Sequence, residues 1–179
     1  MTTNNQIPSD IKKRLLFFKD GVREEFSFLR DFNYFLDEEE FGRTENFKNY
    51  FFKFSFRNVD RLINIHFSTD IINGMKISFP SLKEEELPSV DSSISCSIWD
   101  KTVFMSVHSY IETKFPDIPQ DDFTIKMGSL ELELEITKVI KNYSDFFKTN
   151  LTSVLEKKII YNCYTDRFND KVFKEIHKL

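Results

Sequence analysis

Apolar residues near the start of the chain recur every three or four positions, the period of a helix with one apolar face. They are Ile11, Leu15, Phe18, Val22, Phe26 and Leu29. Ser9 precedes this stripe and can cap a helix that begins at Asp10, because its hydroxyl can accept a hydrogen bond from an unpaired amide of the first turn. Residues 31–46 lose the period, so we expect them to form mainly an exposed connection.

The period changes from 3.6 to 2 in the next stretch, which predicts an extended chain. One side of that chain carries four rings, at Tyr50, Phe52, Phe54 and Phe56. The opposite side carries Lys53 and Arg57. Turn-forming residues at 58–60 are followed by a second alternating run at 63–67, so a hairpin is predicted, with the four rings facing the helices.

Two further alternating runs predict a third strand at 75–79 (MKISF) and a fourth at 93–99 (SISCSIW). Residues 81–92 and 116–128 are expected to form loops, because they combine prolines with acidic residues. Residues 103–115 leave two interpretations open. Val103, Val107 and Ile111 suit a helix, whereas Val103, Met105 and Val107 suit a strand.

The last part of the chain returns to helical spacing. One stripe, after a capping Ser129, consists of Leu132, Ile136, Val139, Ile140, Tyr143 and Phe147. A break near 149–150 precedes a shorter helix through Val154 and Leu155. A final stripe predicts a basic tail helix within 162–179, capped by Asp166, and consists of Phe168, Val172, Phe173, Ile176 and Leu179.

Together these elements predict an α+β domain. We expect a four-stranded antiparallel β-meander with the N-terminal and C-terminal helices packed on one face, because short connections favour antiparallel pairing. A chain of 179 residues fits a single domain over 1–179, with residues 1–8 disordered.

Charge argues against a nucleic-acid ligand. The formal net charge is −4, whereas phosphate binding normally requires a basic face. Residues 141–179 hold 8 Lys+Arg and 5 Asp+Glu, a net +3, so the remainder holds 17 against 24, a net −7. The aromatic strand does not reverse this conclusion, because its four alternating rings point away from Lys53 and Arg57.

Acidic runs in the predicted loops are the candidate partner-binding residues. Loop carboxylates are commonly just solvated charge, but together they could form a negative surface for a basic partner. The residues are Asp37, Glu38, Glu39, Glu40, Glu84, Glu85, Glu86, Asp121 and Asp122. A second candidate surface is the polar side of the hairpin, with Lys53, Arg57, Asn64 and His66.

Catalytic and cofactor signatures are lacking. Cys96 could pair with His66 or His108 as a nucleophile, but no spacing supports this and a buried strand cysteine is the commoner case. No two histidines stand four residues apart, and neither GxGxxG nor GxxxxGK[ST] occurs. We therefore expect no enzyme activity, no metal and no cofactor.

The run from Leu15 to Phe18 is too short for a signal-peptide core, and no stretch approaches the ~18 apolar residues of a membrane span. A cytoplasmic protein with free thiols at Cys96 and Cys163 and no membrane association is expected.

Four segments carry a resemblance to a known group of proteins: FSFLRDFNYF, FKFSFRNVDRLINIHFS, MKISF and LELEITKVIKNYSDFFKTNLTSVL. Over residues 11–156 their order resembles small bacterial immunity-type proteins of polymorphic or contact-dependent toxin systems. The resemblance implies high-affinity binding to a cognate toxin domain, and the acidic loops would suit a basic nuclease toxin. It transfers no site residue.

The first functional hypothesis is therefore a protein-binding module, with such an immunity protein as its specific form. A structural or homo-oligomeric protein without catalysis is the first alternative. The second is a small-ligand binder or enzyme with a pocket between sheet and helices, using Cys96, His108 or a loop carboxylate.

Overall fold

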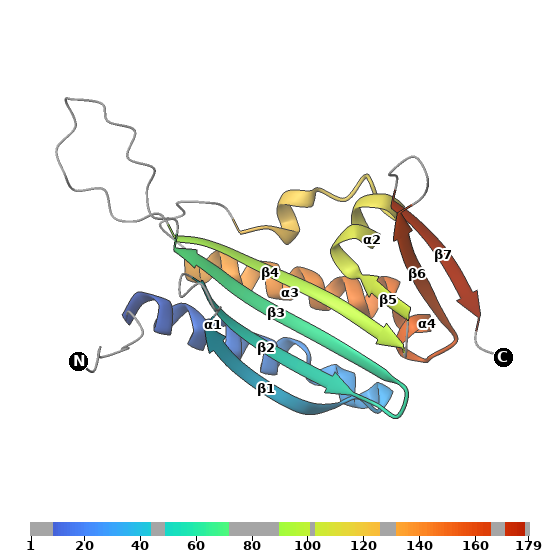
Figure 1. Ribbon diagram of the computed structural model, residues 1–179, viewed down its shortest axis with the longest axis horizontal. Helices are drawn as coiled ribbons and strands as arrows, with labels where there is room; N and C mark the ends of the chain where they lie inside the picture. The colour runs from blue at the N-terminus through green and yellow to red at the C-terminus, as the bar shows by residue number, and fades with distance from the viewer. Residues whose placement is uncertain are drawn as a thin grey trace.

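The computed structural model describes residues 9–43, 49–71, 90–100, 103–125, 132–165 and 171–177. Five strands form one antiparallel sheet in the order β1-β2-β3-β4-β5, and two more form a separate hairpin, β6-β7. Helices α1 and α3 lie behind the five-stranded sheet in Figure 1, so the predicted α+β class, the meander and the helices on one face are confirmed.

Helix α1 (Ser9–Glu25) and the 3-10 helix η1 (Ser27–Phe32) contain the first predicted stripe. All six of its apolar residues are buried. Gly21 allows a close approach to the other long helix, α3, since a Cβ there would lie 3.0 Å from Cδ1 of Ile140. The stripe thus fixes which face of α1 packs on the sheet and on α3.

Strands β2 (Asn49–Arg57) and β3 (Arg61–Ile71) form the predicted hairpin. The side-chain oxygen of Asn58 accepts hydrogen bonds from the backbone N–H groups of Asp60 and Arg61, which stabilises the turn. Strand β4 (Val90–Asp100) pairs with β3 along its whole length and contains the predicted run at 93–99. The strand predicted at 75–79 lies outside the described residues, as do residues 1–8.

The exposed connection predicted for residues 31–46 is largely wrong. Part of it forms β1 (Phe35–Arg43), an unpredicted strand that lies at the edge of the sheet and pairs with β2. The register shifts between Leu36 and Glu38, so a bulge interrupts the alternation. This irregularity and the acidic composition hid the strand from the sequence pattern.

Each interpretation of residues 103–115 is correct for one part of the segment, which forms first a strand and then a helix. Strand β5 (Val103–Ser106) pairs with β4, and helix α2 (Val107–Lys114) begins directly after it. Ser106 caps the helix, since its hydroxyl accepts from the N–H of Ser109 at 3.3 Å. Ser106 is thus both the last residue of β5 and the N-cap of α2.

Helix α3 (Leu132–Asn150) and the short α4 (Thr152–Leu155) occur where the helical spacing predicted them. The 3-10 helix η2 (Gln120–Phe123) lies in the predicted loop before α3. The predicted tail helix is wrong, because the described part of 159–177 forms strands β6 (Ile159–Thr165) and β7 (Lys171–His177). Val172 and Ile176 are four residues apart, a spacing that suits both periods, so pairing between the two strands decides.

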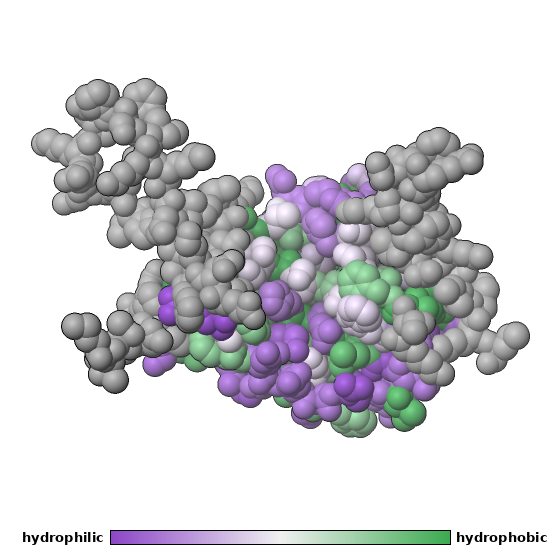
Figure 2. Space-filling view, in the orientation of Figure 1, coloured by the Kyte–Doolittle hydropathy of each residue, from purple (hydrophilic) through white to green (hydrophobic). Residues whose placement is uncertain are grey.

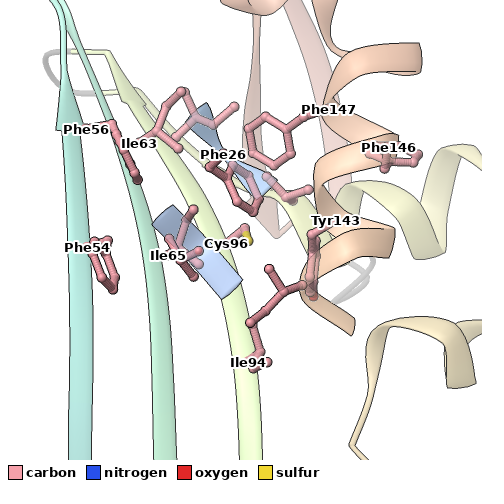
Figure 3. Packing of buried hydrophobic residues seen from close by; sticks show 14 of the residues in the cluster. Phe26, Phe54, Phe56, Ile63, Ile65, Ile94, Cys96, Tyr143, Phe146 and Phe147 are labelled. Atoms are coloured by element: carbon pink, nitrogen blue, oxygen red, sulfur yellow. The ribbon is translucent and has the colours of Figure 1, made fainter. Parts of the chain in front are cut away.

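The core lies between the sheet and the helices, as Figure 3 shows for side chains of β2, β3 and β4 that point toward α3. Phe18 of α1 packs against three rings of the sheet, those of Phe52, Phe54 and Phe67, at centroid distances of 5.2–6.2 Å. The prediction that the rings of β2 face the helices is confirmed. The opposite face of the sheet is turned to the viewer in Figure 1.

An ion pair is buried at the end of this core. Nε of Arg61 lies 2.7 Å from a carboxylate oxygen of Asp100, and Arg61 also donates to the carbonyl of Val154. The pair joins β3, β4 and α4. Tyr34 lies beside it, and burial raises the pKa of Tyr34 to about 12, although the charge of Arg61 acts in the opposite direction.

Candidate interaction surface

The acidic run at 37–40 lies on β1 and is paired with cations of the same chain. Asp37 pairs with Arg57 at 2.7 Å, and Glu38 and Glu40 pair with Lys53 at 3.3 and 2.6 Å. Glu39 points to the other face of the sheet, where α1 supplies Lys19 at 3.3 Å and Arg23 at 2.5 Å. Four carboxylates therefore face four cations.

These ion pairs shift the pKa values of Glu39 and Lys53. Partial burial alone would raise the pKa of Glu39, but hydrogen bonds from Arg23 and Lys19 outweigh it and hold that pKa below its usual value. A hydrogen bond with Glu40 raises the pKa of Lys53. Most of the negative charge of this run is consequently balanced by cations of the same chain.

The remaining acidic candidates do not join this run. Asp121 and Asp122 lie on η2, and Asp122 pairs with Lys138 of α3 at 3.0 Å. Residues 84–86 lie outside the described residues. The structure therefore does not gather the described acidic candidates into one surface.

The face of the sheet that neither α1 nor α3 covers, called here the open face, is the second candidate. Its side chains alternate with the buried ones along β3 and β4, and Figure 2 shows hydrophilic and hydrophobic residues mixed on the side that faces the viewer. Lys53, Arg57, Asn64 and His66 lie on this face, as the alternation predicted. Burial is the main cause that lowers the pKa of His66, and the positive charge of Lys53 lowers it further.

Cross-strand register builds one row of large side chains on the open face. Successive partners in the five strands, named here the aromatic row, are Phe35, Arg57, Leu62, Trp99 and Phe104. At about 4.8 Å between strands the row is ~19 Å long. Phe35, Trp99 and Phe104 are 58%, 40% and 36% exposed, and the rings of Trp99 and Phe104 lie 4.6 Å apart.

The next row along the strands is polar. It runs from Glu38 through Ser55, Asn64 and Ser97 to Ser106, and Ser55 donates to the side-chain oxygen of Asn64 at 2.9 Å. All the ionic pairs of the open face described above involve β1 and β2. The described open-face side chains of β4 and β5 are only serines, Trp99 and Phe104. The open face thus has an ionic half and an uncharged half with an exposed aromatic pair.

Cys96 offers no chemistry to a substrate. Its side chain is buried on the face of the sheet that packs against the helices, called here the covered face. Burial raises the pKa of its thiol. The thiolate needed for nucleophilic attack is therefore disfavoured. The side chain of Cys163 lies outside the described residues.

His108 has a different environment. Its Nδ1 lies 3.4 Å from the hydroxyl of Tyr143 and its Nε2 lies 3.4 Å from the carboxylate of Glu112. His108 lines a cavity at the edge of β4. Among the described residues no group of three or more His, Cys, Asp or Glu is placed to hold a metal ion.

Sequence reasoning missed the aromatic row. Trp99 and Phe104 were visible only as members of separate segments, and Phe35 lay in the predicted connection. The available signal was the position of Trp99 on the polar side of the alternating run at 93–99, where serine otherwise recurs. A large aromatic residue at an exposed strand position is a hint of an interaction surface.

Comparison of the chain with family models gave no match, and neither a curated protein nor a solved structure matches it. Within the described part of the chain, no helix has the length and apolar character needed to cross a membrane.

Proposed function

We propose that this protein is a protein-binding module that docks its partner on the open face of the sheet. The observation that carries the proposal is the aromatic row, in which Trp99 and Phe104 form a contacting pair on a face that neither α1 nor α3 covers. Trp and Arg are the residue types most enriched among those that dominate binding energy, and the row contains one of each.

The distribution of charge on the open face supports the same proposal. Protein interfaces are depleted of charge at their centre and have a polar rim. Around Trp99 and Phe104 the described side chains are uncharged, and the ionic groups Asp37, Lys53 and Arg57 lie toward the opposite edge. A partner with an apolar centre and a polar flank fits this arrangement better than a uniformly basic one, since the carboxylates of β1 are already paired.

The experiment compares two doubly substituted baits. Trp99→Ser/Phe104→Ser removes the exposed pair, and Leu16→Ser/Phe17→Ser removes a matched exposed apolar pair on α1, where the exposed fractions are 50% and 38%. Proteins of the native cell are captured on each bait and on the unchanged chain. We expect one protein to be retained by the chain and by the α1 variant and lost from the Trp99/Phe104 variant, with thermal unfolding unchanged.

Two results would contradict the proposal. One is that the Trp99/Phe104 variant retains every protein captured by the unchanged chain. The other is that all three baits capture the same background proteins. Light scattering of the purified chain tests the homo-oligomer alternative. If the chain forms a concentration-dependent dimer and the Trp99/Phe104 variant does not, the partner is a second copy of the chain.

A toxin-neutralising immunity role is the finer form of the proposal, and its support is the resemblance of residues 11–156. A nuclease target attracted by the acidic run has less support, because Lys19, Arg23, Lys53 and Arg57 balance that run. Co-expression with the neighbouring upstream gene product tests the role: growth protection by the chain, lost with Trp99→Ser/Phe104→Ser, is expected. A non-toxic upstream product would contradict it.

A further inference from the structure

A cavity of about 420 Å³ lies at the outer edge of β4. Strand β5 pairs only with residues 97–100 of β4 and gives way to α2 at Val107. The cavity lies beyond that point, between β4, the start of α2 and the end of η2. Its walls consist of Ser93, Ile94, Ser95, Ser106, His108, Phe123, Thr124 and Ile125. A cavity of this volume is within the range of sites that hold small molecules or buried side chains.

The lining separates into an apolar and a hydrogen-bonding part. Ile94, Phe123 and Ile125 supply the apolar part, and four hydroxyl groups and the imidazole of His108 supply the other. None of the described lining residues is Asp, Glu, Lys or Arg, although these types make up 30% of the chain. A charged group placed here would lose water without gaining a counter-ion from the wall, so the cavity favours an uncharged occupant.

Neighbouring contacts hold the polar part in place. The hydroxyl oxygen of Ser106 accepts from the N–H of Ser109, which leaves its proton available for donation. His108 lies between Tyr143 and Glu112, and the ring of Tyr143 packs against Phe123 at 4.9 Å. The wall is therefore pre-organised by residues outside the cavity, which lowers the entropy lost when an occupant binds.

We infer that this cavity receives a tyrosine side chain of the partner protein. The inference rests on the proposed function, because Ser93, Ser95 and Ser106 also belong to the open face, so the cavity adjoins the docking surface. The apolar wall accepts the ring. The phenol hydroxyl both donates and accepts, as serine and threonine hydroxyls do, whereas an indole N–H only donates.

The test uses 4-methylphenol as the tyrosine surrogate and follows the full chain by NMR during titration. We expect saturable shifts at the His108 ring and at the methyl groups of Ile94 and Ile125. Toluene, which lacks the hydroxyl, should bind roughly tenfold more weakly, the value of about one hydrogen bond. Absence of saturable shifts, equal binding of toluene, or tighter binding of 3-methylindole would each overturn the inference.

Two substitutions locate the binding. Thr124→Trp fills the cavity from its exposed rim and should abolish the response to 4-methylphenol, whereas Thr137→Trp at an exposed position of α3 should not. Unchanged binding to a folded Thr124→Trp variant would place the phenol elsewhere and overturn the inference.

The outcome is separable from that of the proposed function. Trp99→Ser/Phe104→Ser should leave the binding of 4-methylphenol unchanged while removing the partner. If the partner binds through Trp99 and Phe104 but Thr124→Trp does not weaken it, the tyrosine site is wrong and the docking surface stands. If 4-methylphenol binds the cavity but no partner depends on the aromatic pair, the proposed function is wrong.

Discussion

The two faces of the sheet each carry an Arg–Asp ion pair of the same length, and the two pairs have opposite surroundings. Arg61 and Asp100 lie 2.7 Å apart on the covered face and are 0% and 4% exposed. Arg57 and Asp37 also lie 2.7 Å apart, on the open face, and are 56% and 42% exposed. The distance between the atoms therefore says little about what each pair contributes.

The difference lies in what remains when one partner is removed. An exposed charge regains water, so a surface pair contributes about 0–1 kcal/mol. A buried charge cannot regain water, and its loss of a partner is strongly destabilising. Removing one partner of a buried ion pair on the covered face is therefore costly, whereas the open face tolerates such a change. A tolerant, partly apolar face is the one available for a partner.

Arg61→Ala gives the largest expected effect. It leaves Asp100 buried without its cation and should lower the free energy of unfolding by about 3–5 kcal/mol in urea denaturation. Arg57→Ala, the matched control, should cost about 1 kcal/mol or less. Equal losses would remove the distinction between the two faces. The double variant Arg61→Met/Asp100→Leu should recover most of the loss, because it leaves no unpaired buried charge.

Ile65→Ala and His66→Ala test the two faces at adjacent positions of β3. Ile65 is fully buried among the helices, and its truncation should cost ~3 kcal/mol through lost burial and the cavity left behind. His66 lies on the open face against the ring of Phe51, and its truncation should cost less than ~1 kcal/mol. A larger loss from His66→Ala, measured by thermal unfolding, would contradict the assignment of faces.

Gly42→Ala tests a tight contact on the open face. A Cβ at Gly42 would lie 2.3 Å from the ring of Phe51, so the ring must move away from its place over β1. We expect a loss of about 2 kcal/mol and altered NMR shifts of His66, which stacks on that ring. Gly21→Ala is the control and should stay within ~1 kcal/mol, because the closest atom to its Cβ, Cδ1 of Ile140 at 3.0 Å, needs to move only slightly and alanine favours the helix over glycine. An unperturbed His66 would show that Phe51 does not cover Gly42.

Glu39→Gln should give the smallest effect, and one that depends on pH. Because the pKa of Glu39 is held below its ordinary value of 4.5, the carboxylate stabilises the fold above that pH and this stabilisation disappears as the pH falls through the folded-state pKa. The variant should be less stable by up to ~1 kcal/mol near pH 7, and this difference should shrink to nothing as the pH falls through the folded-state pKa of Glu39. Glu24→Gln, at an exposed position of α1, is the control for the loss of one surface carboxylate.

Much of the fold could be predicted from local periodicity. The spacing of Phe18 and Val22, and the alternation of Phe54 with Lys53, identified the buried side of α1 and of β2 without knowledge of their neighbours. Strand β1 could not be found in this way, because strands are poor in acidic residues and a bulge breaks its alternation. Its carboxylates are accommodated only by cations that β2 and α1 supply.

The candidate site was predictable only in part. Alternation placed Lys53, Arg57, Asn64 and His66 together on one side of the hairpin. It could not bring Phe35, Leu62 and Trp99 into one row, because they come from three segments whose register is set by pairing.

The period of apolar residues within one segment was enough to predict which side of α1, α3, β2, β3 and β4 is buried, because that property depends on one segment alone. The other features came from contacts between segments: the edge strand β1, the β6-β7 hairpin in place of a tail helix, the ion pairs of the acidic run and the aromatic row. Each of these depends on which residues lie opposite one another across strands or helices. These contacts are set by pairing between segments that are distant in the sequence, so they cannot be predicted from the pattern within one segment.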